Sequence, residues 1–167
     1  MKSKKKDLYQ SVWDLQDIAY DLMTEYDGIP HYYGDEFMYH TEGQVIDLIA
    51  QNPGITVTDI ADITKKTTSA CSQLIRKLRE RGCVEQTRNE KNNRKYNLTL
   101  TDTGKKIYKE RRVFNQKCQN IMDEMLANFS EEELEHHIMV QKKINEVYRG
   151  DIERSKVAAE KTPKVKK

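Results

Sequence analysis

The feature that most constrains the fold of this chain is a change of apolar period in its middle. Residues 56–63 carry apolar side chains at helical spacing, a turn of a few residues follows, and residues 67–82 repeat the helical spacing until Gly82 ends it. From residue 83 to residue 101, apolar and polar residues alternate on both sides of the polar run NEKNN, which predicts a β-hairpin. Two short helices joined by a tight turn and followed by a hairpin predict a winged helix-turn-helix, a mainly helical α+β fold.

The second helix of this unit, TTSACSQLIRKLRERG, has two different faces. One face is apolar, at the spacing of a helix that packs on a core, and consists of Cys71, Leu74, Ile75 and Leu78. The other face carries short polar side chains and one arginine: Ser69, Ser72, Gln73 and Arg76. Exposed helix faces usually carry better helix formers than serine. In the major groove of DNA, however, short side chains let the helix backbone approach the base edges, to which Ser, Gln and Arg can hydrogen-bond.

We therefore predict that this helix and the turn before it bind double-stranded DNA. Thr67 is expected to cap the helix, whose N-terminus adds partial positive charge, and the neighbouring lysines can neutralise phosphates. The alternative is that these are ordinary surface residues. The predicted contacts from this part of the chain are Lys65, Lys66, Thr67, Thr68, Ser69, Ser72, Gln73, Arg76 and Lys77.

The charge distribution favours the same partner. Between residues 64 and 112 there are 15 Lys and Arg residues against 5 Asp and Glu residues, although the whole chain has a net charge of only +2. A basic segment between acidic flanks is expected of a module that binds nucleic acid, and Arg94 and Lys95 lie near the tip of the predicted hairpin. The alternative is that the basic residues only keep exposed helices soluble.

Long amphipathic helices are predicted on both sides of this unit. In residues 8–26 the apolar side chains are spaced alternately by four and three residues, as in a coiled-coil seam, and a similar register recurs after residue 102. Ser130 and Glu133 form a capping box that begins a last helix, and Thr56 with Asp59 forms a capping-box-like start of the helix predicted from residue 56. A monomer of this size has difficulty covering all of these apolar faces, so we predict a homodimer, with an intramolecular helical arm as the alternative.

The predicted organisation has three parts. Residues 1–30 and 102–150 form a helical dimerisation region, and residues 36–101 form the winged helix-turn-helix DNA-binding domain. Residues 151–167 have few large apolar side chains and are predicted to form a disordered basic tail.

Three motifs carry a resemblance to a known family. The runs PGITVTDIA, TTSACSQLIRKLRERGCVEQ and NNRKYNLTLTDTGKK lie within residues 40–110, and this segment resembles the core of the multiple antibiotic resistance regulator (MarR) family of bacterial transcription factors. The resemblance implies a cytoplasmic, homodimeric regulator, in most cases a repressor that binds pseudo-palindromic DNA and is released by a small-molecule effector. The recognition-helix positions of the family fall on Thr67, Thr68, Ser69, Ser72 and Gln73.

The resemblance also assigns the wing. The wing of the family carries Asp-x-Arg shortly before Leu-Thr-x-x-Gly, and counting back from Leu100 places the arginine at Arg94 and the aspartate at Asn92. Arg94 would then enter the minor groove, where the negative potential favours a guanidinium. Asn92 departs from the pattern, because its amide can hold Arg94 only by a neutral hydrogen bond, which is weaker than a charge-assisted one.

An effector site is implied by the same resemblance. Members of the family often bind a small ligand in a cleft between the dimer helices and the DNA-binding lobe. In this chain, aromatic residues of the first helix and of the segment HYYGDEFMY, which we expect to be irregular, are the candidate lining, and ordinary packing is the alternative. The candidates are Trp13, Tyr20, Tyr32, Tyr33, Phe37 and Tyr39.

Other function classes have weaker support. The sequence has no glycine-rich phosphate loop and no Gly-x-Ser-x-Gly motif, so neither an enzymatic activity nor a cofactor is expected. No apolar run is long enough to span a bilayer, and an odd number of cysteines without C-x-x-C spacing fits a reducing cytoplasm. A winged-helix module that binds a partner protein, or a metal- or redox-responsive regulator, remains the alternative function.

Metal and redox sensing have little support in the cysteine and histidine residues of the chain. Cys71 and Cys83 lie at apolar positions of the pattern, which argues against reactive thiols. Adjacent His136 and His137 point about 100° apart on a helix, so they cannot both bind one metal simply. The available metal ligands are His31, His40, Glu42, His136 and His137, and no metal site is predicted.

Overall fold

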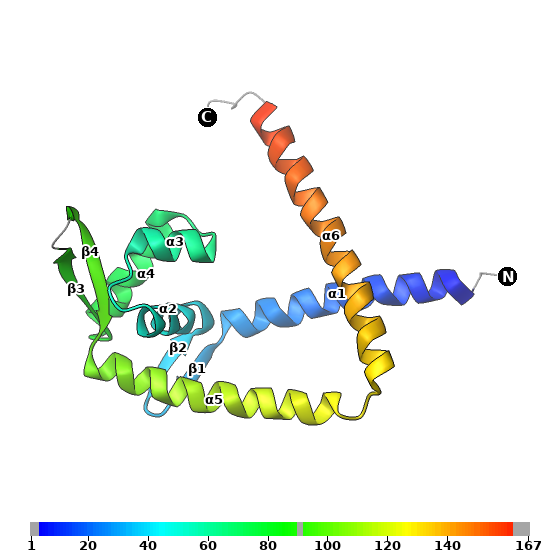
Figure 1. Ribbon diagram of the computed structural model, residues 1–167, viewed down its shortest axis with the longest axis horizontal. Helices are drawn as coiled ribbons and strands as arrows, with labels where there is room; N and C mark the ends of the chain where they lie inside the picture. The colour runs from blue at the N-terminus through cyan, green and yellow to red at the C-terminus, as the bar shows by residue number, and fades with distance from the viewer. Residues whose placement is uncertain (1–3, 90–91, 162–167) are drawn as a thin grey trace. The chain divides into compact units, whose positions relative to one another are not determined.

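The computed structural model describes the backbone of residues 4–89 and 92–161, and all of their side chains except those of residues 89, 92–95, 160 and 161. The chain divides into two compact units, residues 1–117 and residues 118–167. Figure 1 shows the order of elements, which is α1 (Lys4–Gly28), β1 (Pro30–Tyr33), β2 (Glu36–Tyr39), α2 (His40–Gln51), α3 (Val57–Thr64), α4 (Thr68–Glu80), β3 (Val84–Asn89), β4 (Asn92–Leu100), α5 (Asp102–Leu126) and α6 (Glu131–Lys161).

The winged helix-turn-helix predicted from the middle of the sequence is confirmed. Helices α3 and α4 are separated by Lys65, Lys66 and Thr67, and Lys65 adopts the left-handed backbone conformation, φ +57°, that ends α3. Strands β3 and β4 then pair antiparallel, with Val84 opposite Leu100 at the base of the hairpin.

The core of the first unit lies between α2, α3, α4, the base of the β3–β4 hairpin and the start of α5. Its members are apolar residues that repeat at helical spacing in the helices and alternate in the strands. Fully buried examples are Ile46, Ile60, Leu78, Leu98 and Ile107. Because each of these five elements contributes its apolar face, removal of any one would expose the others.

Two helix starts agree with the capping boxes expected from the sequence. Thr56 Oγ1 accepts a hydrogen bond from the backbone N–H of Asp59, and Asp59 Oδ2 accepts one from the backbone N–H of Thr56. At the start of α6, Ser130 and Glu133 exchange hydrogen bonds in the same way. The backbone N–H and hydroxyl of Ser130 hold the pKa of the Glu133 carboxyl below its usual value, because both hydrogen bonds favour the charged form.

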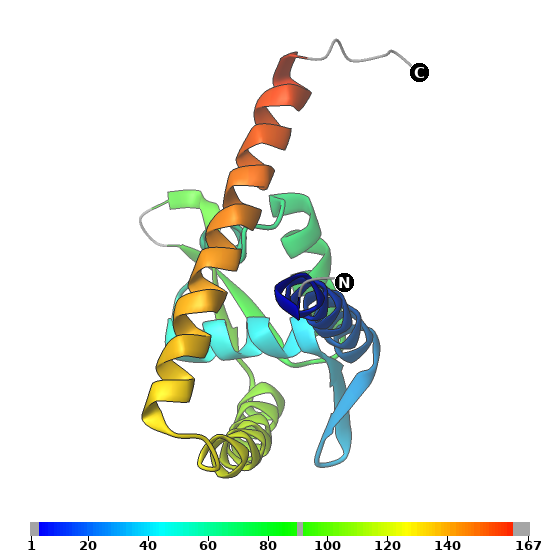
Figure 2. The same ribbon diagram turned by 90° about the vertical axis from the view of Figure 1, so that its right-hand side faces the viewer.

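The segment HYYGDEFMY, expected to be irregular, is instead a β-hairpin. Strands β1 and β2 pair antiparallel from Pro30 opposite Tyr39 to Tyr33 opposite Glu36. Gly34 takes a positive φ of +66° in the two-residue turn, a conformation that glycine adopts without strain. Figure 2 shows α1 leading into this hairpin. His31 and Tyr33 are buried at alternate positions of β1. This short alternation is the sequence feature that could have predicted a strand here.

Of the tail predicted to be disordered, residues 151–161 are instead helical, because α6 continues to Lys161, and residues 162–167 lie outside the described residues. The extension contains no proline or glycine after Gly150 within the helix and carries Ala, Glu, Lys and Arg, which are good helix formers. The second unit consists of the end of α5 and of α6. No helix in the described part of the chain is both long enough and apolar enough to cross a membrane.

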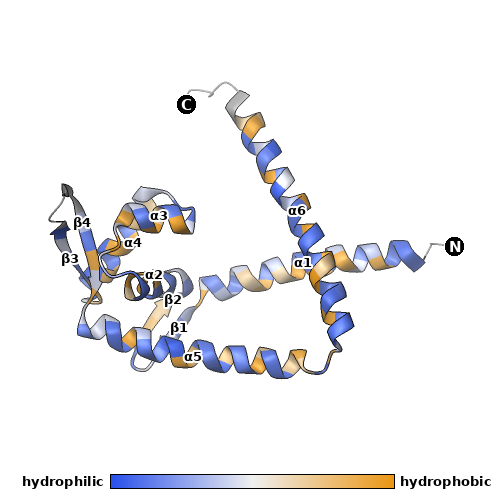
Figure 3. Cartoon of the chain, viewed as in Figure 1, coloured by the Kyte–Doolittle hydropathy of each residue, from blue (hydrophilic) through white to orange (hydrophobic). Residues whose placement is uncertain are grey.

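Large apolar side chains remain exposed on the terminal helices. Helix α1 has no buried residue, and Figure 3 shows hydrophobic positions recurring along α1 and α6. On α1 the exposed set includes Leu8, Val12, Leu15, Ile18 and Leu22, and on α6 it includes Ile138, Val140, Val147, Ile152 and Val157. These residues include the α1 seam predicted from the sequence.

Candidate nucleic-acid interface

Helix α4 presents the polar face that the sequence predicts. Thr67 caps the helix, and its hydroxyl accepts a hydrogen bond from the backbone N–H of Ala70 at 3.2 Å. The Ser72 hydroxyl donates to the backbone carbonyl of Thr68 at 2.8 Å. The side chains predicted from this part of the chain are all exposed, namely Lys65, Lys66, Thr67, Thr68, Ser69, Ser72, Gln73, Arg76 and Lys77. Ser69, Ser72, Gln73 and Arg76 thus form an exposed face of α4, whereas Lys77 forms an ion pair with Glu42.

The opposite face of α4 fixes the helix to the core. Cys71, Ile75 and Leu78 are buried, as their spacing predicts, and Leu74 packs partly buried against the same cluster. The polar face therefore cannot turn inward without removing this stripe from the core, at a cost of about 1.5–3 kcal/mol for each large side chain.

A buried carboxylate ties the end of α4 to the start of α2. Glu42 is only 1% exposed, and its Oε1 lies 2.7 Å from the Lys77 ammonium. Its Oε2 lies 3.3 Å from an Arg81 guanidinium nitrogen and accepts a hydrogen bond from the backbone N–H of Tyr39 at 3.0 Å. The Lys77 ammonium, which the sequence suggested as a phosphate contact, is also over the Tyr39 ring. In the structure this ammonium forms an ion pair with Glu42.

Arg81 also ties the end of α4 to neighbouring elements, a role that the sequence pattern did not indicate. Its guanidinium pairs with Glu36 at 3.4 Å, donates to the backbone carbonyl of Phe37 and lies 5.0 Å from the centre of the Phe37 ring. The residue follows the last turn of α4, so it joins the recognition helix to the β1–β2 hairpin. Its position in a charged run, RKLRERG, gave no local signal for these distant partners.

Arg111 on α5 is a buried ion-pair partner. It is 3% exposed, its Nε donates to Asp47 at 2.8 Å, and one terminal nitrogen donates to the Tyr33 hydroxyl at 2.7 Å. Helix α2 passes close to the guanidinium at Gly43, where a Cβ atom would overlap it. In the sequence Arg111 interrupts an apolar register, and that interruption was the signal of a polar partner inside the fold.

The residues of the predicted effector lining lie in different surroundings in this chain. Tyr33 belongs to the core, since it is 3% exposed and packs edge-on against Phe114, and desolvation raises the pKa of its hydroxyl. Tyr32 and Phe37 are exposed and lie together, with ring centres 6.1 Å apart. Tyr39 is partly buried beside Lys77, and Trp13 and Tyr20 are exposed side chains of α1. Tyr33 and Tyr39 therefore pack within the fold, whereas Trp13, Tyr20, Tyr32 and Phe37 lie on the surface.

The structure describes the β3–β4 wing only in part. Backbone pairing of β3 and β4 is described as far as Asn89 opposite Asn92. The side chains of Asn92, Arg94 and Lys95, which complete the predicted DNA-binding set, lie outside the described residues.

The potential metal ligands and thiols have other surroundings. His31 Nε2 lies 2.9 Å from the backbone carbonyl of Tyr26, and His40 Nε2 lies 2.9 Å from the Gln44 amide. Within residues 4–89 and 92–161, no group of three or more His, Cys, Asp or Glu side chains is placed to hold a metal ion. Cys71 and Cys83 are buried, and desolvation raises the pKa of the Cys83 thiol, which disfavours the reactive thiolate. Cys118 is exposed.

Comparison with known proteins gives one family. Residues 40–95 match the model of the MarR family. An uncharacterized HTH-type transcriptional regulator of Bacillus subtilis, YhjH, is 28% identical over 94 residues, which cover 56% of this chain and 54% of the relative. The chain therefore spans about half the length of the curated relative that it matches.

Solved structures agree on the fold. The zinc-responsive MarR family member ZitR of Lactococcus lactis superposes with a TM-score of 0.73 at 17% identity, over 84% of this chain and 99% of that one. FabT of Streptococcus pneumoniae, solved in complex with DNA, superposes with a TM-score of 0.63 at 21% identity, over 87% of this chain and 98% of that one. A Staphylococcus aureus MepR–DNA complex gives a TM-score of 0.59 at 19% identity, over 81% and 96%.

Proposed function

The chain belongs to the MarR family of winged-helix transcriptional regulators, and from this premise we propose that it is a homodimeric, DNA-binding transcriptional repressor. The observation that carries the proposal is the division of α4 into a buried apolar stripe and an exposed face of Thr, Ser, Gln and Arg side chains. Such a face has no use in packing, and it has the hydrogen-bonding groups that base edges in the major groove require. FabT and MepR, which share the fold, were crystallised with DNA.

The proposed binding mode assigns α4 to the major groove and the β3–β4 hairpin to the adjacent minor groove. Gln73 is expected to read a base, because its amide can pair with both the N6 and N7 positions of adenine. Lys65 and Lys66 are expected to neutralise phosphates beside it. Arg94 is the proposed minor-groove residue.

Dimerisation is proposed from the exposed apolar side chains of the terminal helices. Leu8, Val12, Leu15 and Leu22 repeat along α1 with exposed fractions of 37–62%. A soluble monomer rarely leaves so many large apolar residues in contact with water, and a second copy would cover them. Two-fold symmetry would then present two α4 helices to the half-sites of a pseudo-palindrome, about one DNA turn apart.

Release by a small-molecule effector is proposed as the regulatory step, with the exposed pair Tyr32 and Phe37 as the part of the aromatic set available to contact a ligand. A ligand that releases the protein from its operator must bind the free protein more tightly than the DNA-bound protein. Screening small aromatic compounds for those that both raise the melting temperature and weaken operator binding tests this step.

The central experiment is selection of bound fragments from random double-stranded DNA, followed by binding measurements on the selected site. We expect an enriched pseudo-palindrome. Gln73→Ala should relax base preference at one position in each half-site, at a cost of about 1–3 kcal/mol for the preferred base. A uniform loss of affinity across all sequences would mean that Gln73 contacts only the backbone. Failure to enrich any sequence would favour the alternative, a winged-helix module that binds protein.

A further inference from the structure

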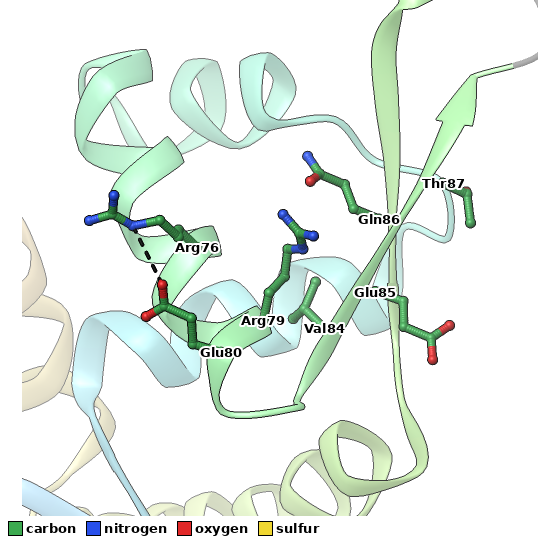
Figure 4. A pocket seen from close by; sticks show the side chains of 7 residues that line it. All are labelled: Arg76, Arg79, Glu80, Val84, Glu85, Gln86 and Thr87. Carbon is green, nitrogen blue, oxygen red and sulfur yellow. Dashed lines mark ion pairs between the residues drawn. The ribbon is translucent and has the colours of Figure 1, made fainter.

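A pocket between α4 and the wing has no role in the contacts described so far. It has a volume of about 590 Å³ and lies between the C-terminal half of α4 and strand β3 (Figure 4). Arg76 and Arg79 line it from the helix, and Gln86 lines it from the strand. The pocket is therefore an opening on the surface of the first unit with cationic and amide donors on its walls.

Arg79 is the residue whose side chain is best placed in this pocket. It lies three residues after Arg76 and seven after Ser72, both of which are helical spacings, so it extends the exposed polar face of α4 toward the hairpin. Figure 4 shows its guanidinium pointing into the space between α4 and β3, on the side of Gln86. No carboxylate among the described side chains forms an ion pair with Arg79.

The acidic residues of the pocket do not cancel this charge. Glu80 lies 3.8 Å from Arg76, with both side chains about 70% exposed, so this ion pair is weak. Glu85 lies on the strand beside Gln86, but Figure 4 shows its carboxylate directed away from Arg79 and Gln86. Figure 4 shows the Arg79 guanidinium and the Gln86 amide pointing into the space between α4 and β3, whereas the Arg76 guanidinium points toward Glu80.

The geometry of DNA indicates that a backbone phosphate would lie at this pocket. If α4 lies in the major groove and the β3–β4 hairpin in the adjacent minor groove, one sugar–phosphate strand separates those two grooves. That strand must cross the protein between α4 and β3, which is where the pocket opens. Guanidinium groups bind phosphate oxygens through paired N–H donors, and a Gln amide nitrogen adds a further donor.

We propose that this α4–β3 pocket binds a phosphate of the DNA backbone through Arg79 and Gln86, and so sets the spacing between the helix in the major groove and the wing in the minor groove. The inference rests on the proposed function and extends it to a specific backbone contact. It predicts a contact that is independent of base sequence.

The test compares Arg79→Gln with the wild type on the selected operator over a range of KCl concentrations. In the proposed dimer the substitution removes one phosphate contact in each half-site, so it should lower the slope of log K against log salt by about 1.8 and weaken binding about a hundredfold, equally on operator and unrelated DNA. Arg112→Gln is the matched control, because Arg112 is an exposed arginine of α5 outside the pocket. Circular dichroism melting verifies that both variants are folded.

A chemical substitution in the DNA locates the contact. Replacing single phosphates by neutral methylphosphonates along the strand between the two grooves should reveal one position in each half-site that weakens wild-type binding. The Arg79→Gln variant should be insensitive to that position. Equal sensitivity of both proteins at every position, or an unchanged salt slope, would overturn the inference while leaving DNA binding intact. If the wild type binds no DNA at all, the proposed function fails and this inference with it.

Discussion

Arg111 shows what a single residue contributes to this fold. On the apolar spacing of α5 it is an interruption, yet it is buried and engaged by Asp47 and by the Tyr33 hydroxyl. An unpaired guanidinium in this position would lose its hydration without compensation, a cost of several kcal/mol. The partners come from β1 and α2, so Arg111 connects three elements through one side chain. This arrangement requires glycine at position 43, because α2 can approach the Arg111 guanidinium only where a Cβ is missing.

Gly43→Ala is therefore expected to destabilise the protein. The added Cβ would overlap the Arg111 guanidinium, and overpacking of this kind costs about 1–3 kcal/mol, even though alanine is the better helix former. Urea unfolding followed by circular dichroism measures the change. Gly150→Ala in α6 is the matched control, since its nearest neighbour would be the flexible Arg154 side chain. We expect that control to be neutral or stabilising by up to about 1 kcal/mol; equal effects of the two substitutions would contradict the account of Gly43.

At the scale of the element, α4 is held at two places of different chemistry. Its middle is held by the buried stripe Cys71, Ile75 and Leu78, and its C-terminal end by the ion pairs of Glu42. The stripe fixes which face is exposed. The ion pairs fix the position of the helix end against α2 and the β1–β2 hairpin, because Coulomb attraction at short range is strong where water is excluded.

Glu42→Gln should reveal the contribution of the second attachment. The substitution removes the charge that Lys77 and Arg81 face, and we expect a loss of about 2 kcal/mol in the free energy of unfolding. This is less than the roughly 3–5 kcal/mol for a fully buried pair, because the half-exposed Lys77 can return to water. Denaturant unfolding measures it. The control is Glu80→Gln, which removes an exposed ion pair with Arg76 and should change stability by less than about 0.5 kcal/mol. A Glu42→Gln protein as stable as this control would exclude an anchoring role.

At the scale of the whole molecule, the exposed apolar side chains on the terminal helices favour the proposed dimer. Helix α1 has 25 residues and buries none of them, so its own contacts within the chain do not explain its apolar repeat. Helices of this length gain most of their stability from packing an apolar face rather than from intrinsic propensity. A second copy of the chain is the partner that the proposed function supplies.

Light scattering after size exclusion is expected to give twice the chain mass of 19.6 kDa at micromolar concentration. Leu15→Glu, which places a charge in the middle of the α1 apolar repeat, should shift the mass toward the monomer, because burying the carboxylate in the interface is costly. Gln10→Glu adds the same charge to α1 outside the repeat and should leave the mass unchanged. A monomeric wild type would refute the dimer.

The sequence by itself determined the local features of this protein. The two faces of α4, the capping boxes at Thr56 and Ser130, and the β3–β4 hairpin all follow from spacing within about twenty residues, and the structure has each of them. Such features are predictable because helix and strand periods place neighbouring residues on one face whatever the rest of the chain does. Local pattern failed where it was short, at the β1–β2 hairpin, and where apolar content was low, at the end of α6.

Only the tertiary structure decided which charged side chains meet. Glu42 and Arg81 are 39 residues apart in sequence, and Asp47 and Arg111 are 64 residues apart. Apart from the interruption of an apolar register at Arg111, nothing in the local pattern distinguishes these charges from the many that face water, since an ion pair depends on where the folded backbone brings its two ends. The same holds for Tyr33, an aromatic that could have lined a ligand site and is instead part of the core. Periodicity decides which way a side chain points, whereas packing between distant elements decides what it meets there.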